Sequence, residues 1–147
     1  MIGIVLIGHE HIASEMLAAL EHVLGRQSLI QAIDVARDHP PELLRQQLGE
    51  ATRSCNAGAG VLVLADMFGG TPCNAALAML HPGEVEVVSG MNMPALIKAA
   101  TLRQQVIDVT VLVVQVAEAG RRYICVATDL MEGGAQEAAP PAAVGRS

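Results

Sequence analysis

Short apolar runs alternate with longer segments of helical periodicity along most of this chain. Two of the runs, 2–7 (IGIVLI) and 61–65 (VLVLA), hold aliphatic residues with no polar alternation, which is typical of strands buried on both faces of a parallel sheet. A third run, 29–35 (LIQAIDV), alternates apolar and polar residues, as a more exposed strand does. Together with 84–88 (EVEVV), these runs predict four strands separated by helices.

The segments between the strands carry helix signals. One stripe of apolar residues recurs at helical spacing from Ile12 to Val23, and proline, which fits the first turn of a helix, begins several of the later segments. The valines of 106–120 favour a strand, but its length and its ending favour a helix packed on the sheet. The predicted helices cover 12–23, a stretch from Pro40-Pro41 through Leu48, 72–80 with Thr71 as N-cap, 93 or 94 to about 102, and 106–120.

The end of the chain differs in composition from the rest. The segment 123–128 (YICVAT) predicts a last strand, at an edge of the sheet or antiparallel to it, and after it Gly, Ala and Pro replace bulky apolar residues. We therefore expect one domain over 1–128 and a flexible tail over 129–147. The alternation of strands and helices predicts an open, mostly parallel, doubly wound α/β sheet with helices on both faces, whose ligands gather at the carboxyl ends of the strands.

Composition narrows the classes of function. The chain of 147 residues has a formal net charge of −6 and nine scattered basic residues, so it lacks the cationic stripe that nucleic-acid binding requires. Its three cysteines are an odd number and match neither a disulfide framework nor a zinc signature, which favours a reducing cytoplasm. No apolar stretch approaches the roughly 20 residues of a membrane span. We expect a soluble, cytoplasmic protein with no nucleic-acid partner and no direct membrane insertion.

Two polar residues directly follow the two most apolar strands. His9 ends the first of them and Asp66 follows the third strand, and in a doubly wound sheet these two strands can be neighbours. A carboxylate that accepts from one imidazole nitrogen leaves the other nitrogen unprotonated and nucleophilic. Taken singly, each residue has a plainer interpretation, because strand ends often hold solvated histidines and turn-forming aspartates.

The loop after the third strand adds a second element. Its two glycines, Gly69 and Gly70, allow close approach of the backbone, and the helix that begins near Thr71 directs free N–H groups toward the same crevice. Such a loop can bind an anion, although most Gly-Gly pairs are simple turns. Combined with His9 and Asp66, it predicts phosphoryl transfer through histidine.

A metal-dependent hydrolase is the competing interpretation. His9 and His11 form a His-x-His pattern at the end of the first strand, which barrel hydrolases use to bind metals. A barrel of that type takes about 250 residues. The remaining histidines lack the spacing of metal ligands, so we expect neither a metal nor a cofactor.

Three separated motifs resemble those of a known family in order and spacing: IGIVLIGH, VLVLADMFGGTPCNAA and SGMNMPAL. Over about residues 1–128, the chain resembles the enzyme IIA components of the mannose class of the bacterial phosphoenolpyruvate-dependent sugar phosphotransferase system. The resemblance implies an open α/β sheet, usually in a homodimer that exchanges its last strand, which here would be 123–128.

The resemblance also implies a function. His9 would take a phosphoryl group from the phosphocarrier protein HPr and pass it to an enzyme IIB on a separate chain, for sugar uptake. Asp66 matches the aspartate partner of that histidine, the loop around the phosphate matches Gly69, Gly70 and Thr71, and Asn92 falls in a site-flanking segment. The alternative is a regulatory protein of the same system, in which phosphorylation of His9 controls partner binding without sugar transport.

One position departs from the family pattern. Many members have Thr-His-Gly at the site, whereas this chain has Gly8-His9-Glu10, which adds a carboxylate and His11 beside the nucleophile. We expect this departure to alter the choice of partner or the lifetime of the phosphate.

Overall fold

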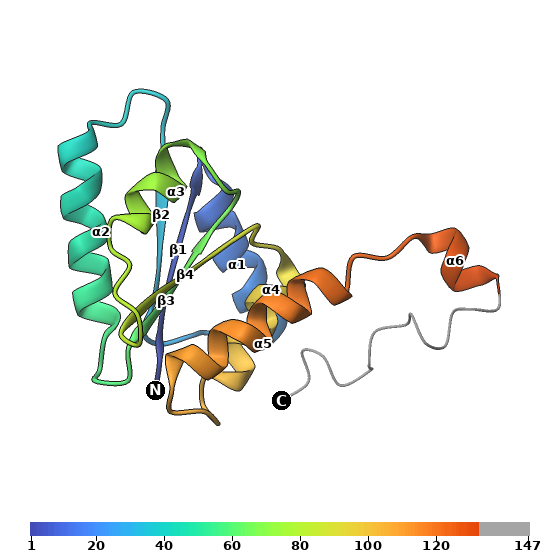
Figure 1. The fold of residues 1–147 in the computed structure, drawn as a ribbon. Coiled ribbons are helices and arrows are strands. Elements are labelled where there is room, and N and C mark those ends of the chain that lie inside the picture. The colour runs from blue at the N-terminus through green and yellow to red at the C-terminus, as the bar shows by residue number, and fades with distance from the viewer. Residues whose placement is uncertain (133–147) are drawn as a thin grey trace.

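The sheet has four strands, all parallel, in the order β2-β1-β3-β4 (Figure 1). The computed structural model describes residues 1–132. The strands are β1 (Gly3–His9), β2 (Ile30–Val35), β3 (Val61–Ala65) and β4 (Val85–Ser89). The predicted open, doubly wound parallel sheet is thereby confirmed, and the alternating run does form an edge strand, β2.

Helices cover both faces of this sheet, as predicted. One face packs against α1 (Ile12–Leu24), α4 (Met93–Leu102) and α5 (Val109–Arg122), and the other against α2 (Pro41–Cys55) and α3 (Gly70–Leu77). The segment with mixed signals is therefore a helix, and Asp108 caps it by accepting a hydrogen bond from the Thr110 N–H. Within the described residues, 1–132, no helix is both long enough and apolar enough to cross a membrane.

Alternation of side chains along the two central strands divides the core into two clusters. Ile4 and Leu6 of β1 face α1, α4 and α5, whereas Val5 and Ile7 face α2 and α3. All four side chains are fully buried, because both neighbours of β1 in the sheet and helices on both faces cover them. Burial on both faces explains why this strand contains no polar alternation.

The strand order places a topological switch point between β1 and β3. The chain leaves β1 toward β2 on one side and then crosses to β3 on the other, so α1 and α2 lie on opposite faces. At such a point the connections diverge and leave a crevice beyond the carboxyl ends of the strands. His9 and Asp66 lie at these ends.

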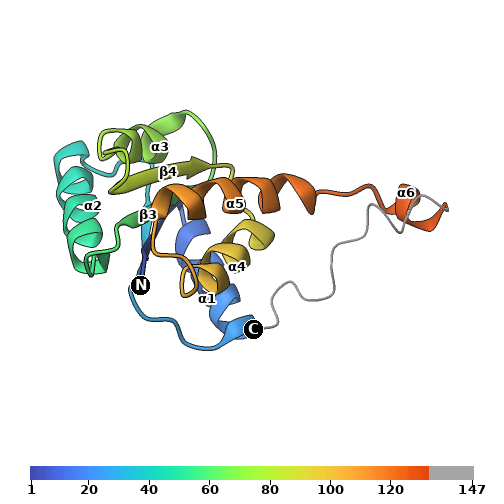
Figure 2. The ribbon, with the colours of Figure 1, turned by 60° about the horizontal axis from the view of Figure 1, so that its bottom comes forward.

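The prediction of a strand over 123–128 is wrong for the single chain. Residues 123–126 are irregular, and Ala127–Met131 forms a short helix, α6, that stands off from the sheet in both views (Figures 1 and 2). A strand needs a neighbouring edge for its hydrogen bonds, and the direction of α5 carries this segment away from the sheet of its own chain. Exchange of the segment with a second copy stays a prediction.

The end of the domain at residue 128 stays a prediction: helix α6 spans that residue, and most of the predicted tail, 133–147, lies outside the described residues. The bounds of one predicted helix differ. Helix α3 begins at Gly70, with Gly69 rather than Thr71 as its N-cap, and ends at Leu77 rather than at residue 80. Both glycines have positive φ, 85° and 78°, so the chain turns into the helix two residues earlier than a threonine cap would allow.

Candidate functional site

His9 and Asp66 form a tightly connected pair at the switch point. The Nδ1 atom of His9 lies 2.8 Å from Oδ2 of Asp66, and the backbone N–H of His9 donates to the same oxygen at 2.9 Å. A carboxylate only accepts hydrogen bonds, so the proton of the neutral imidazole lies on Nδ1. The other ring nitrogen, Nε2, therefore carries the free lone pair.

The carboxylate of Asp66 is held in its ionised form. Burial raises the pKa of this carboxyl, but hydrogen bonds from the backbone and ring of His9, the positive charge that His9 can carry, and the Met67 N–H together lower the pKa below its ordinary value of 3.8. Its side chain is only 9% exposed, compared with 43% for His9. The pair thus consists of a buried anion and an accessible imidazole.

Two glycines leave room for this pair. A Cβ at Gly8 would lie 3.3 Å from the Cβ and Cγ atoms of Asp66, so the backbone of β1 passes close to the carboxylate. A Cβ at Gly70 would lie 3.2 Å from Cε1 and Nε2 of His9. The start of α3 therefore lies directly beside the free nitrogen. The sequence did predict a close approach of the backbone at Gly69-Gly70, but the role of Gly8 was missed.

The remaining predicted site residues differ in how they relate to His9. A Cβ at Gly69 would meet nothing within 4 Å, and Thr71 is exposed on the first turn of α3. Asn92 is the N-cap of α4: its Oδ1 accepts from the Ala95 N–H at 3.0 Å, and its Nδ2 donates to the Gly120 carbonyl at 2.9 Å. Its side chain therefore joins α4 to α5, and its place as a site-flanking residue stays a prediction.

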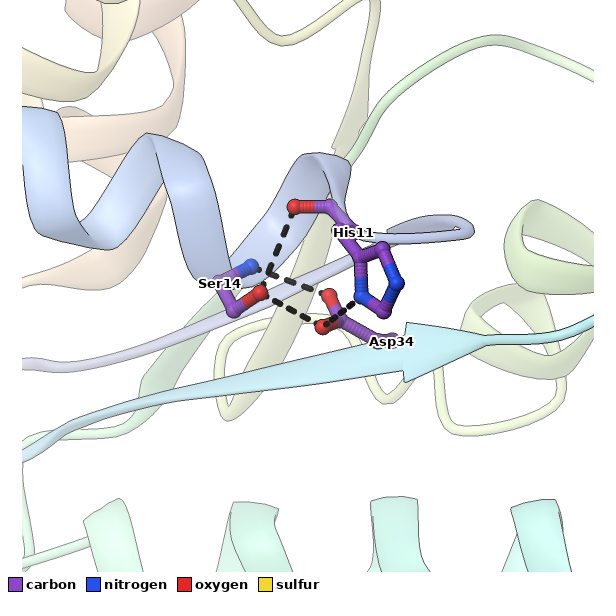
Figure 3. A network of polar contacts seen from close by, with 3 residues as sticks. All are labelled: His11, Ser14 and Asp34. Atoms are coloured by element: carbon purple, nitrogen blue, oxygen red, sulfur yellow. Dashed lines mark hydrogen bonds and ion pairs between the residues drawn. The ribbon is translucent and has the colours of Figure 1, made fainter.

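His11 and Asp34 form a second histidine–aspartate contact (Figure 3). Asp34 of β2 accepts from the Ser14 N–H at 3.0 Å and from the Ser14 hydroxyl, and its Oδ2 lies 3.4 Å from Nδ1 of His11. Burial raises the pKa of Asp34, but the bonds from Ser14 and His11 lower it on balance. The carboxylate thus caps the first turn of α1 from a neighbouring strand, a function that the sequence pattern did not reveal.

Metal chemistry has no candidate centre in the part of the chain that the structure describes. Among residues 1–132, no group of three or more His, Cys, Asp or Glu side chains is arranged to hold a metal ion. His9 and His11 each pair with a different aspartate.

Known proteins resemble this chain in sequence. The family model EIIA-man, described as "PTS system fructose IIA component", matches residues 3–115. The mannose-specific EIIAB component of Escherichia coli K12 is 31% identical over 124 residues, which are 84% of this chain and 38% of that protein. The chain thus spans well under half the length of that relative. The sorbose-specific EIIA component of Lacticaseibacillus casei is 32% identical over 100 residues, which are 66% of this chain and 70% of that protein.

Solved structures match the fold over nearly their whole length. The phosphotransferase system component EIIA from Streptococcus agalactiae superimposes with a TM-score of 0.79 at 26% identity, covering 87% of this chain and 98% of that one. The mannose/sorbose specific IIA subunit from Enterococcus faecalis gives a TM-score of 0.75 at 26% identity, covering 85% and 93%. As the three sequence motifs predicted, the chain belongs to the EIIA-man family, the mannose-class enzyme IIA components of the sugar phosphotransferase system.

Proposed function

We propose that this protein is a cytoplasmic phosphocarrier that accepts a phosphoryl group from phospho-HPr on Nε2 of His9 and passes it to a separate enzyme IIB. The single observation that carries the proposal is the pairing of Nδ1 with Asp66, because it leaves Nε2 as a free nucleophile at the exposed carboxyl end of β1. Membership of the EIIA-man family supports sugar uptake as the process that this transfer serves.

The proposed transfer of the phosphoryl group needs no proton donor. Nε2 attacks the phosphorus of the donor's phosphohistidine, the bond between phosphorus and the donor nitrogen breaks, and the electron pair leaves with the donor imidazole. His9 becomes a phosphorylated imidazolium whose Nδ1–H still faces Asp66, and the carboxylate stabilises the positive charge. The first N–H groups of α3, which have no partners within the helix, begin at Gly70 beside Nε2 and are suited to bind the transferred oxygens. Positioning supplies most of the acceleration.

The open position of the site supports a protein as the donor. Small molecules are bound in concave pockets that bury most of their surface. Two cavities, of about 580 and 620 Å³, lie away from His9, one beside β4 and α5 and one at the opposite end of the sheet. His9 instead stands at the exposed carboxyl end of β1.

The direct test is phosphorylation of the purified protein with phosphoenolpyruvate, enzyme I and HPr. We expect the intact mass to rise by one phosphoryl group, with the label labile to acid and stable to base, as a phosphohistidine is. Addition of a IIB from the same system should then remove the label. A protein that stays unlabelled contradicts the proposal, and a label that no IIB removes supports the regulatory alternative.

Replacing Gly70 should slow the phosphorylation. In Gly70→Ala, the new Cβ lies 3.2 Å from Nε2 and occupies space that the phosphoryl group needs. Because small displacements at a reacting centre are costly, we expect a rate about 10²-fold lower. Gly69→Ala is the matched control: its φ is also positive, but its Cβ meets nothing. An equal fall in rate for the two variants would mean that backbone strain, and not the contact with Nε2, slows the transfer. A wild-type rate for Gly70→Ala would contradict the prediction.

We further propose a homodimer that completes the edge of the sheet. Within residues 1–132, β4 pairs with β3 alone in the sheet, and a groove of about 580 Å³ runs between its outer side and α5. Ile124 and Val126, in the segment first predicted as a strand, are 76% and 61% exposed. We expect these side chains to be covered in the dimer.

Light scattering tests the dimer. The wild type should give twice the mass of one chain, and Ile124→Asp should shift the measured mass toward that of the monomer. A monomeric wild type at working concentration contradicts the dimer.

A further inference from the structure

The loop that holds His9 carries two exposed apolar side chains. Met67 is 54% exposed and Phe68, the chain's single phenylalanine, is 73% exposed. Single exposed apolar residues are common on protein surfaces. These two, however, are consecutive, and they lie between Asp66, which binds the His9 ring, and the Gly69-Gly70 turn, where a Cβ at Gly70 would lie 3.2 Å from Nε2.

The backbone fixes where these side chains lie. The Met67 N–H donates to Oδ1 of Asp66 at 2.9 Å, which anchors the beginning of the loop on the same carboxylate that orients His9. Consecutive Cα atoms are about 3.8 Å apart. Both side chains are thus attached within two residues of Asp66, which binds the imidazole.

From this arrangement we propose that Met67 and Phe68 form the docking anchor for the phosphoryl-donor protein. The inference rests on the proposed function and adds to it the surface that recognises the donor. For transfer, the reacting atoms must approach to about 3–3.5 Å, whereas each partner of a standard protein interface covers about 800 Å². A protein whose phosphohistidine reaches Nε2 must therefore cover this loop.

The chemistry of the two residues specifies the partner. A rigid aromatic ring and a flexible thioether contribute apolar contact area and few hydrogen bonds, so the complementary surface is an apolar patch that surrounds the donor's phosphohistidine. Apolar contacts of this kind add affinity without altering the reacting groups. Met67 and Phe68 therefore determine how tightly the donor binds and leave the chemical step to His9 and Asp66.

The test separates binding from chemistry. In Met67→Ala/Phe68→Ala, we expect the KM for phospho-HPr to rise about tenfold or more, as loss of an interface anchor does, while the rate at saturating phospho-HPr stays within about twofold. Phe68→Leu should restore most of the affinity. Ile107→Ala is the matched control, because Ile107 is 90% exposed and lies by the opposite end of the sheet, near the start of β3.

Two control measurements separate a loss of donor binding from a loss of folding or of phosphate stability. The melting temperature of the double variant should match that of the wild type, and its isolated phosphorylated form should lose phosphate at the wild-type rate. An unchanged KM, or a fall in the saturated rate alone, overturns the docking anchor while the phosphocarrier function stands. A wild type that takes no phosphate from HPr overturns both.

Discussion

After incubation with phosphoenolpyruvate, enzyme I and HPr, His9→Ala should carry no phosphate. The substitution removes the nitrogen that faces the start of α3, and no other group takes its place beside Gly70. Because the side chain is 43% exposed and ends a strand that is paired on both sides, the loss should leave the fold intact. Intact mass measurement would reveal the loss of label directly.

His11→Ala is the matched control for this substitution. It also removes an imidazole that contacts an aspartate, two residues further along the same turn, but its ring is 81% exposed and lies beside Asp34 rather than the site glycine. We expect this variant to be labelled as fully as the wild type. A label retained by His9→Ala, or lost by His11→Ala, would move the acceptor to another residue.

Asp66→Asn should slow the transfer by about 10²-fold or more, since the proton position on the imidazole depends on the carboxylate. An amide can donate to Nδ1, and the ring proton then moves to Nε2 and removes the nucleophilic lone pair. The amide also lacks the charge that stabilises the phosphorylated imidazolium. Rapid-quench measurement of label transfer from phospho-HPr gives the rate.

The same change at the neighbouring carboxylate provides the comparison. Asp34→Asn keeps a cap for α1 and touches His11 rather than His9, so its transfer rate should stay within about threefold of the wild type, as surface changes away from a site usually do. If the rate of Asp66→Asn also stays within that range, Asp66 has no part in the mechanism.

The stability of the fold at acid pH gives a second test of the role of Asp66. Because its pKa in the folded protein is below the ordinary value of 3.8, the carboxylate stabilises the fold at pH values above that value, and the contribution disappears as the pH falls through the folded pKa. Asp66→Asn should therefore lose stability at pH 7 and show a weaker dependence on pH in the acid range. Urea unfolding at several pH values measures both effects.

Local sequence pattern predicted the sheet and the central pair because each depends on short-range chemistry. Burial on both faces of β1 and β3 requires unbroken aliphatic runs, and polar residues directly after such runs must emerge at the carboxyl edge. Strand order then brings His9 and Asp66 together, which follows once β1 and β3 are neighbours. The glycine pair predicted a close approach, although only the structure identifies Gly70 as the position where a side chain would crowd His9.

Features that depend on residues far apart in the sequence could not be predicted from the local pattern. Capping of α1 by Asp34 joins residues 20 positions apart in sequence, and no local signal marks it. The residues of 123–128 favour a strand, but strand formation requires an edge to pair with, and within one chain the segment ends in α6 instead. Thr71 has the chemistry of a cap, yet two consecutive glycines with positive φ begin the helix before it.

A histidine that partner proteins can reach is also one that water can reach. Under the proposed function, a phosphoryl group on His9 would lie at the carboxyl end of β1 on a side chain that is 43% exposed, where hydrolysis would compete with transfer to the partner. The proposed phosphocarrier would therefore hold each phosphoryl group briefly before transferring it. The phosphorylated fraction of the protein would then depend on the rates of phosphorylation, transfer to the partner and hydrolysis. We expect this fraction to fall promptly when phosphorylated donor is no longer supplied.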